Sequence, residues 1–415
     1  MYNQFINSIE IRDLRNTPPC EIKLPEDRRT HLIITGPNGC GKTSLVKELY
    51  TSLIQRVNYT ENIANSISEN SGAEWTELAI RFNSINDIYT RGFLSDLRKK
   101  NQTLKVVPDI ALLPAFHISR HRHNFLVYNS EAHRKGVFNT PSGPKALPEI
   151  STGEQFIQLL VNMKTQQAYL FQDMKTAAKE TDKINAQADY NDIVQWFGNL
   201  HEALAELFGH SNFDLDFDRH HYNYSVNEQG KVPYNFTQLS DGYSAILRIV
   251  TDLMLAMSTN PLNTYAMPGI AIIDEIETHL HVELQQKILP FLTKFFPNIQ
   301  FIVTTHSPFV LSSISNAVIF DMRSHVQYHD FSKYSYSNLI EGYFNVSLYS
   351  KAIIDELAHN IALLEKEQLE NGDKASVLEF DRKISELPAF QPTELQNRWL
   401  QAKLKHIDKF NDIDN

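Results

Sequence analysis

Residues 36–43 form a glycine-rich segment of the type that binds phosphate. The segment reads GPNGCGKT, which fits G-x-x-x-x-G-K-[ST], between the apolar run 32–34 and the helix-like residues 44–58. The glycines accept backbone angles that side chains forbid, so that consecutive N–H groups can turn toward a phosphate. Lys42 then reaches the β- and γ-phosphates, and the hydroxyl group of Thr43 ligates Mg²⁺. The predicted nucleotide-binding residues are Gly36, Pro37, Asn38, Gly39, Cys40, Gly41, Lys42, Thr43 and Ser44.

Two apolar segments farther along the chain end in side chains that suit phosphate hydrolysis. Residues 269–273, GIAII, read as a buried strand, and the carboxylates Asp274 and Glu275 follow them. We expect Asp274 to hold the magnesium shell and Glu275 to orient or activate the attacking water. His306 follows the second segment, 299–304, and its neutral imidazole could bond to the γ-phosphate and sense its loss. A lone histidine at a strand end is more often structural, but in this company we favour a functional role.

Residues 239–244, LSDGYS, offer a second anion site. Ser240 and Gly242 stand where the apolar helix 245–253 would begin. A helix N-terminus attracts anions because its first N–H groups are unpaired and its dipole is positive there. Alone the segment is a weak signal, since any capped helix could look like this, and only its neighbours make it strong.

Together the four motifs resemble, in order and spacing, the head of ABC-type ATPases. The resemblance covers roughly residues 1–50 and 236–320. It implies that ATP and Mg²⁺ lie between two heads, where Ser240 and Gly242 of one subunit contact the γ-phosphate held by Lys42 of the other. One chain carries one copy of each motif, so a homodimer or higher homo-oligomer is implied. The correspondences are Walker A at 36–43, the signature at 239–244, Walker B at 270–275 and the switch histidine at His306.

Residues 274–286 and 296–308 look like a narrower group within that superfamily. Its members are transporter-free ATPases related to the overcoming-lysogenization-defect proteins and to the ATPase subunits of the antiphage systems Septu, PARIS and certain retrons. Val282 departs from the proline that commonly follows Leu-His in that group, which is a mild difference at a loop. His279 and His281 could be read as metal ligands, but the resemblance makes them packing residues of a loop near the dimer interface.

Nucleases of the overcoming-lysogenization-defect group continue into a Toprim domain, which this sequence is predicted to lack. Such a domain needs a glutamate and then an Asp-x-Asp around a metal. Glu341 faintly resembles the glutamate, but no suitably placed Asp-x-Asp follows, and Asp412 and Asp414 stand at the end of the sequence. The resemblance therefore favours an ATPase that gates a separately encoded effector, with a nuclease as the leading candidate, in antiphage defence.

The predicted fold is an α/β P-loop NTPase, an ABC-type head with a mixed central sheet, a small antiparallel N-terminal sheet and a helical insertion. Alternating residues predict strands within 5–15 and 20–24. Helical periodicity over 155–208 predicts two helices too short for the long coiled-coil arms of chromosome-structuring ATPases. Paired strands are expected near 214–226, and amphipathic helices over 350–410. The expected domains are 1–150 with Walker A, 151–210 as the helical insertion, 211–325 with the remaining motifs and 326–415 as a helical region.

The composition is ordinary for a soluble globular protein. The 415 residues are 42% hydrophobic and 21% charged, no apolar run is long enough to span a membrane, and the N-terminus lacks the blocks of a signal peptide. Of the two cysteines, Cys20 and Cys40, the second lies in the phosphate loop, where a disulfide would compete with nucleotide. We therefore expect a cytoplasmic protein without a membrane partner.

Two other functions remain open. A DNA-repair or chromosome-associated ATPase would bind nucleic acid itself, although the net charge of −10 argues against a surface that grips it everywhere. Basic side chains between 117 and 135 could contact phosphates, but a solvated basic loop is the plainer interpretation. The other possibility is a scaffold that holds ATP and scarcely hydrolyses it. The candidate phosphate contacts of the first alternative are Arg120, Arg122, Arg134 and Lys135.

Overall fold

The computed structural model describes ten stretches of the chain, which form two compact units that divide between Tyr334 and Ser335. The basic side chains of Arg120, Arg122, Arg134 and Lys135, considered above as phosphate contacts, lie outside the described residues. The described ranges are 5–14, 17–54, 104–107, 125–132, 155–209, 213–258, 267–344, 350–366, 368–386 and 394–414.

A six-stranded mixed sheet forms the centre of the first unit, in the order β12-β11-β3-β10-β9-β5. Its five strands from β11 to β5 run parallel, and β12 is antiparallel at one edge. Every residue of β3, β9, β10 and β11 is buried, as expected where both faces of a parallel sheet are covered. The mixed α/β sheet predicted from the sequence is therefore confirmed. The strands are β3 His31–Thr35, β5 Leu126–Ser130, β9 Gly269–Ile273, β10 Ile299–Thr304, β11 Ala317–Asp321 and β12 Val326–His329.

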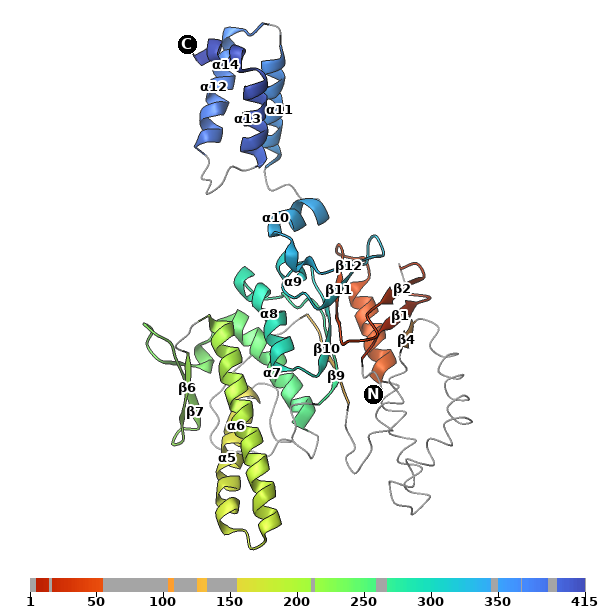
Figure 1. Ribbon diagram of the computed structural model, residues 1–415, viewed down its shortest axis with the longest axis vertical. Helices are drawn as coiled ribbons and strands as arrows, with labels where there is room; N and C mark the ends of the chain where they lie inside the picture. The colour runs from red at the N-terminus through yellow and green to blue at the C-terminus, as the bar shows by residue number, and fades with distance from the viewer. Residues whose placement is uncertain are drawn as a thin grey trace. The chain divides into compact units, whose positions relative to one another are not determined.

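A small antiparallel sheet and the helix over residues 42–54 cover one face of the central sheet (Figure 1). This sheet has the order β2-β1-β4 and contains both predicted N-terminal strands. Ile9 and Ile22 pack in one apolar cluster with Leu49 of the helix and Ile272 of the central sheet. The helices α7 and α8 lie on the opposite face (Figure 1). The elements are β1 Ser8–Ile11, β2 Cys20–Lys23, β4 Leu104–Val107, α7 Asp241–Ser258, α8 Val282–Phe295 and the short α9 Pro308–Leu311.

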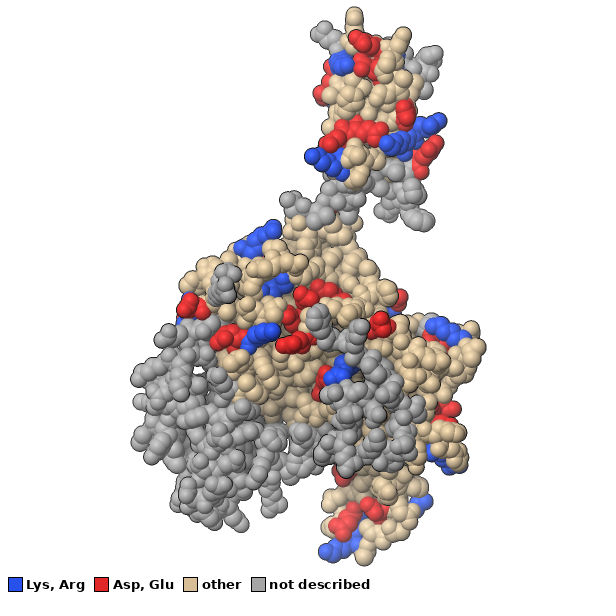
Figure 2. Space-filling model, turned by 180° about the vertical axis from the view of Figure 1, so that it is seen from behind, with Lys and Arg blue, Asp and Glu red and all other residues tan. Residues whose placement is uncertain are grey.

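The helical insertion is an antiparallel hairpin of α5 Gln155–Thr176 and α6 Glu180–Phe208 (Figure 1). Both helices were predicted, and the end of α6 packs against α7, where the Phe208 ring stacks on Tyr243 with centroids 4.3 Å apart. Figure 2 shows acidic and basic side chains intermixed at the free end of the hairpin. Lys183 pairs there with Glu180 at 3.3 Å. This end of the hairpin therefore carries no field of a single sign.

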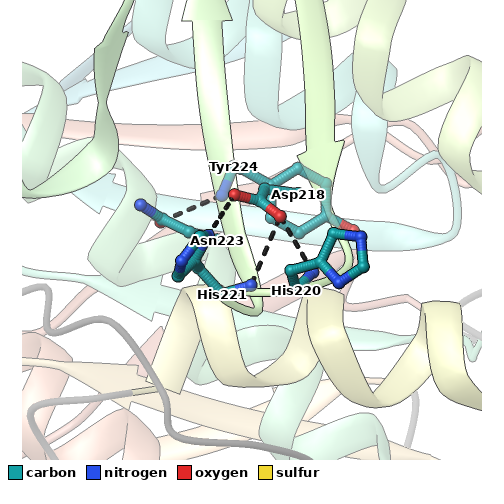
Figure 3. A network of polar contacts seen from close by, with 5 residues as sticks. All are labelled: Asp218, His220, His221, Asn223 and Tyr224. Carbon is teal, nitrogen blue, oxygen red and sulfur yellow. Dashed lines mark hydrogen bonds and ion pairs between the residues drawn. The ribbon is translucent and has the colours of Figure 1, made fainter.

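A third sheet follows the hairpin and contains the predicted strand pair as β6 Asp214–Asp218 and β7 Asn223–Asn227, with β8 Tyr234–Asn235 beside them. Asp218 organises the turn between β6 and β7 (Figure 3). Its Oδ1 accepts the N–H groups of His220 at 2.8 Å and His221 at 3.3 Å, and its Oδ2 lies 2.6 Å from His221 Nδ1. These bonds give Asp218, the last residue of β6, a local role in forming the turn.

The second unit contains a helical bundle with its own apolar core. Phe380 and Trp399 meet edge to face with centroids 5.0 Å apart, and the Trp399 Nε1–H donates to Asp381 Oδ1 at 2.7 Å. The amphipathic helices predicted over 350–410 are thus confirmed. Within the described ranges, no helix combines the length and apolarity that a membrane crossing requires. The helices are α10 Tyr336–Asn338, a π turn at Leu339–Tyr343, α11 Lys351–Glu365, α12 Asn371–Ser385, α13 Glu394–Lys405 and α14 Ile407–Asp414.

Candidate active site

The glycine-rich loop joins the end of β3 to the helix over 42–54. Gly36, Gly39 and Gly41 have φ values of +133°, +80° and +101°, a region of backbone space that favours glycine. A Cβ atom on Gly36 would also come within 3.0 Å of the Cys40 sulfur. The loop conformation therefore requires glycine at these positions, as the phosphate-loop pattern predicts.

Lys42 folds back over this loop. Its side chain is buried, and the Nζ donates to the carbonyl oxygens of Gly36 at 2.9 Å and Pro37 at 3.1 Å. The neighbouring side chains of Asn38, Thr43 and Ser44 are exposed to solvent. The loop therefore places the buried Lys42 ammonium group next to polar side chains that water, or an anion, can reach.

A hydrogen bond joins the phosphate loop to the end of β9. The Thr43 hydroxyl donates to Asp274 Oδ2 at 2.9 Å, and the Thr304 hydroxyl at the end of β10 donates to Asp274 Oδ1 at 2.6 Å. Both oxygens of the Asp274 carboxylate are thereby oriented, although the two residues that hold them are 231 and 30 positions away in the sequence. The parallel arrangement of β3, β9 and β10 brings these three strand ends together.

Glu275 begins a tight turn at the same edge of the sheet. Its φ of +46° is uncommon for a residue with a side chain. The Glu275 N–H donates to the Thr304 hydroxyl at 2.7 Å, and its Oε2 lies 3.4 Å from the Thr278 hydroxyl. Thr304 thus bonds to both carboxylate residues, Asp274 and Glu275. A positive φ such as that of Glu275 is a form of backbone strain that recurs at functional sites.

His306 lies two residues beyond β10. Its N–H donates to Glu277 Oε1 at 2.6 Å, and its ring Nε2 is buried with no partner among the described residues. Burial lowers the pKa of His306, and Lys42 lowers it further, against the opposing effect of Glu277 and the other nearby carboxylates. The imidazole is therefore neutral at neutral pH, the state that the sequence argument required.

Ser240 and Gly242 stand at the start of α7. Ser240 is exposed, whereas Gly242 is buried so closely that an added Cβ would lie 2.8 Å from the Leu284 Cδ1 and 3.3 Å from the His279 carbonyl oxygen. Among the hydrogen bonds of the described residues, none joins Ser240 or Gly242 to the phosphate loop of the same chain.

The predicted residues therefore fall into two groups. The first, which we call the phosphate side, joins Lys42, Thr43, Asp274, Glu275 and His306 around the ends of β3, β9 and β10. The second, the signature side, consists of Ser240 and Gly242 at the start of α7. Sequence reasoning missed Thr304 and Glu277, which connect members of the phosphate side. The polar pair Thr304-Thr305 closing an apolar strand was the available signal for the first of them.

The donor set of the phosphate side suits Mg²⁺ and a nucleoside triphosphate. A threonine hydroxyl and an aspartate carboxylate are hard oxygen ligands of the type that Mg²⁺ takes together with phosphate oxygens. Their oxygens lie 2.9 Å apart. The open loop with Lys42 beside it supplies N–H groups and a positive charge for the phosphates.

Comparison with known proteins places this site within a described family. The family model "AAA domain, putative AbiEii toxin, Type IV TA system" matches residues 32–312, which include every motif of the site. The curated protein "Retron Ec83 probable ATPase" of Escherichia coli is 40% identical over 100 residues, 23% of this chain and 18% of that protein. "Septu protein PtuA" of Bacillus mycoides is 34% identical over 121 residues, 28% of this chain and 16% of that protein. The resemblance drawn from the motifs is thereby confirmed.

The matched segments span less than a fifth of the length of these curated relatives. Among solved structures, the SMC head bound to the C-winged helix domain of ScpA has a TM-score of 0.38 at 12% identity, covering 80% of this chain and 100% of that one. The SMC head domain from Thermotoga maritima has a TM-score of 0.35 at 10% identity, covering 76% and 94%.

Proposed function

We propose that this chain, which belongs to the AAA-domain family matched over residues 32–312, is a Mg²⁺-dependent ATPase that works as a homodimer or higher homo-oligomer and gates a separately encoded effector. The observation that carries the ATPase proposal is the hydrogen bond of 2.9 Å between Thr43 and Asp274. It joins a phosphate loop to a carboxylate strand end, which is the pairing that phosphoryl-transfer sites use to hold Mg²⁺.

Each residue of the phosphate side has a role in this proposal. The loop N–H groups and Lys42 bind the phosphates, with Lys42 exchanging its bonds to Gly36 and Pro37 for phosphate oxygens. Thr43 and Asp274 would hold Mg²⁺, and the bound ion would supply positive charge beside the phosphoryl group.

Glu275 orients the attacking water, and its strained turn fixes the carboxylate for that task. His306 supplies a neutral imidazole, whose unpartnered Nε2 bonds to the γ-phosphate.

The variant Glu275→Gln tests the proposal because it keeps the size and polarity of the side chain but removes the carboxylate. We expect ATP hydrolysis to fall by roughly 100-fold or more while the affinity for Mg²⁺-ATP changes little. Phosphate release and equilibrium nucleotide binding give the two readings. A variant that hydrolyses ATP as fast as the unmodified protein would show that Glu275 has no such role. Little hydrolysis by the unmodified protein would favour the ATP-binding scaffold.

The matched control is Glu206→Gln, the same chemical change at an exposed residue of α6. Glu206 pairs with Lys294 at 2.6 Å on the surface, where such ion pairs contribute little. Hydrolysis by this variant is expected to remain within about twofold of the unmodified rate.

The exposure of Ser240 on the signature side supports the dimer part of the proposal. Ser240, directly before α7, is exposed at the N-terminal end of the helix, where the phosphates of a second copy would bind. The names of the retron and Septu relatives support a setting in antiphage defence, where a nuclease would be the gated effector.

Glu275→Gln also tests this part, by its mass in solution with and without Mg²⁺-ATP. A shift to a dimer or larger assembly is expected. A mass that does not change when Mg²⁺-ATP is added would count against the binding of ATP between two copies. It would not affect the conclusion drawn from the hydrolysis rates.

A further inference from the structure

The turn after β9 and the segment after β10 hold each other through reciprocal bonds. From β10, the Thr304 hydroxyl accepts the Glu275 N–H and the Thr304 carbonyl accepts the Ile276 N–H at 3.1 Å. In the other direction, the Glu277 carboxylate accepts the His306 N–H at 2.6 Å. The proposed water-orienting residue and the proposed phosphate-sensing residue are therefore parts of one bonded unit.

Glu277 is well placed to fix its partner because its own backbone is fixed. The preceding Ile276 is fully buried, and the Glu277 carbonyl accepts the Leu280 N–H at 2.9 Å. The carboxylate therefore extends from an anchored turn, and its bond to His306 is short, as expected for a charged acceptor.

The residues that flank His306 are held by other groups. The Thr305 N–H donates to the Ile34 carbonyl at 3.0 Å, and the Ser307 hydroxyl donates to Gln285 Oε1 at 2.6 Å. Removal of Glu277 would therefore leave the chain on either side in place. What Glu277 adds is the orientation of the His306 peptide group, and with it the direction of the imidazole ring.

Two buried polar atoms in this unit have no hydrogen-bond partner among the described residues: Nε2 of His306 and Oε2 of Glu277. An unpaired buried polar atom costs roughly 1–3 kcal/mol, so native proteins rarely keep one without a reason. The unpaired Nε2 of His306, on a residue whose backbone Glu277 holds, is the atom of this unit that can accept a group arriving with the substrate.

We propose that Glu277 is the positioning residue of His306: its carboxylate holds the histidine backbone so that the ring Nε2 meets the γ-phosphate. This inference rests on the proposed ATPase function. Glu277 acts only through His306 and does not itself touch the nucleotide. The plainer alternative is a carboxylate that merely stabilises the turn.

Four proteins separate these two roles: Glu277→Ala, Glu277→Gln, His306→Ala and the double variant Glu277→Ala/His306→Ala. We expect Glu277→Ala to lower kcat by roughly 10- to 30-fold with KM changed less than about threefold. Glu277→Gln keeps an acceptor oxygen for the His306 N–H and should recover kcat to within about threefold of the unmodified protein. In the His306→Ala background, Glu277→Ala should cost less than about a further twofold, because the residue it acts through is gone.

An equal loss from Glu277→Ala in both backgrounds would overturn the proposal, and so would an unchanged kcat in Glu277→Ala. A turn-stabilising role would lower the unfolding temperature of all Glu277 variants and leave the two losses additive. If Glu277→Ala does not fold, Glu277→Met takes its place, since it keeps the length of the side chain and removes the acceptor. Glu206→Gln again serves as the control with unchanged kcat.

The outcomes also distinguish this inference from the proposed function. If the unmodified protein does not hydrolyse ATP, or if Glu275→Gln hydrolyses it normally, the proposed function fails. If Glu275→Gln and His306→Ala are both slow but the loss from Glu277→Ala is independent of His306, only the inference about Glu277 fails.

Discussion

The phosphate side and the signature side are built in different ways. On the phosphate side, hydrogen bonds of 2.6–2.9 Å link Thr43, Asp274, Glu275 and Thr304 across three strand ends. On the signature side, Gly242 is held by packing against Leu284, and Ser240 is exposed without a bond to the phosphate loop. One side is thus completed within the chain, whereas the other has the form of a surface. The difference supports the proposal that a second copy of the chain completes the nucleotide site.

Of the variants that test the difference between the two sides, Thr304→Val should have the largest effect, because it breaks the hydrogen bonds of the phosphate side. The substitution removes the hydroxyl that donates to Asp274 and accepts from Glu275, and it leaves two polar groups without their partner inside the site. Each such loss costs roughly 1–3 kcal/mol, so we expect kcat to fall by about 100-fold and the unfolding temperature to drop. Steady-state hydrolysis and thermal unfolding measure the two effects. A variant with normal kcat would mean that the strand-end bonds do not organise the site.

His31 begins β3, at the end of the strand opposite the phosphate loop. It belongs to neither the phosphate side nor the signature side and therefore serves as a reference for the stability of the sheet. Burial, and then Arg29, lower the pKa of His31 to about 4 from 6.5, and its Nδ1 accepts the Phe301 N–H at 3.0 Å. Because the folded protein resists protonation here, stability is full above pH 6.5 and falls as the pH drops toward 4, by up to about 3 kcal/mol. Urea unfolding at several pH values measures this loss.

His31→Phe provides the comparison for that titration. Between pH 7 and pH 4 the variant should lose less stability than the unmodified protein, although it starts lower because the Phe301 N–H loses its acceptor. Parallel curves for the two proteins would show that His31 does not titrate as inferred. Either result measures the stability of the central sheet separately from ATP hydrolysis at the phosphate side.

Ser240→Ala should have the smallest effect and the most selective one. Ser240 is exposed and forms none of the bonds of the phosphate side, so nucleotide affinity of the monomer should stay within about twofold. Turnover should fall by roughly tenfold at low protein concentration and recover partly as the concentration rises, because the loss lies in dimer formation. ATPase assays over a range of concentrations check this. A loss that does not depend on concentration would place the role of Ser240 within one chain.

The strand ends and the phosphate loop were predictable because each motif carries its own local signature. Three apolar runs of strand length are followed closely by glycine, aspartate or histidine, and the carboxyl ends of parallel strands meet at one edge. The helical hairpin and the paired strands β6 and β7 were predictable from their periodicity in the same way.

The connections between motifs were not predictable in this way. Thr304 reads as one more β-branched residue of a strand, and Glu277 reads as a charge in a loop. Their roles depend on which strands become neighbours, which periodicity does not encode. The stack of Phe208 on Tyr243 likewise joins an inserted helix to the signature helix through a contact that only the tertiary structure creates.

The order of strands in the central sheet also bears on how the protein is made. The phosphate-loop strand β3 pairs only with β10 and β11, so that His31 and its partner Phe301 are 270 residues apart in the chain. At about 5–20 residues per second, a ribosome needs roughly 15–60 s to add the missing neighbours after β3 is made. The nascent chain therefore carries a phosphate loop without a sheet to support it, and non-local pairing of this kind makes folding slow. If the proposed function holds, nucleotide binding on the ribosome should thus appear only after β11 has emerged, which is also after Glu275 and His306 have been synthesised.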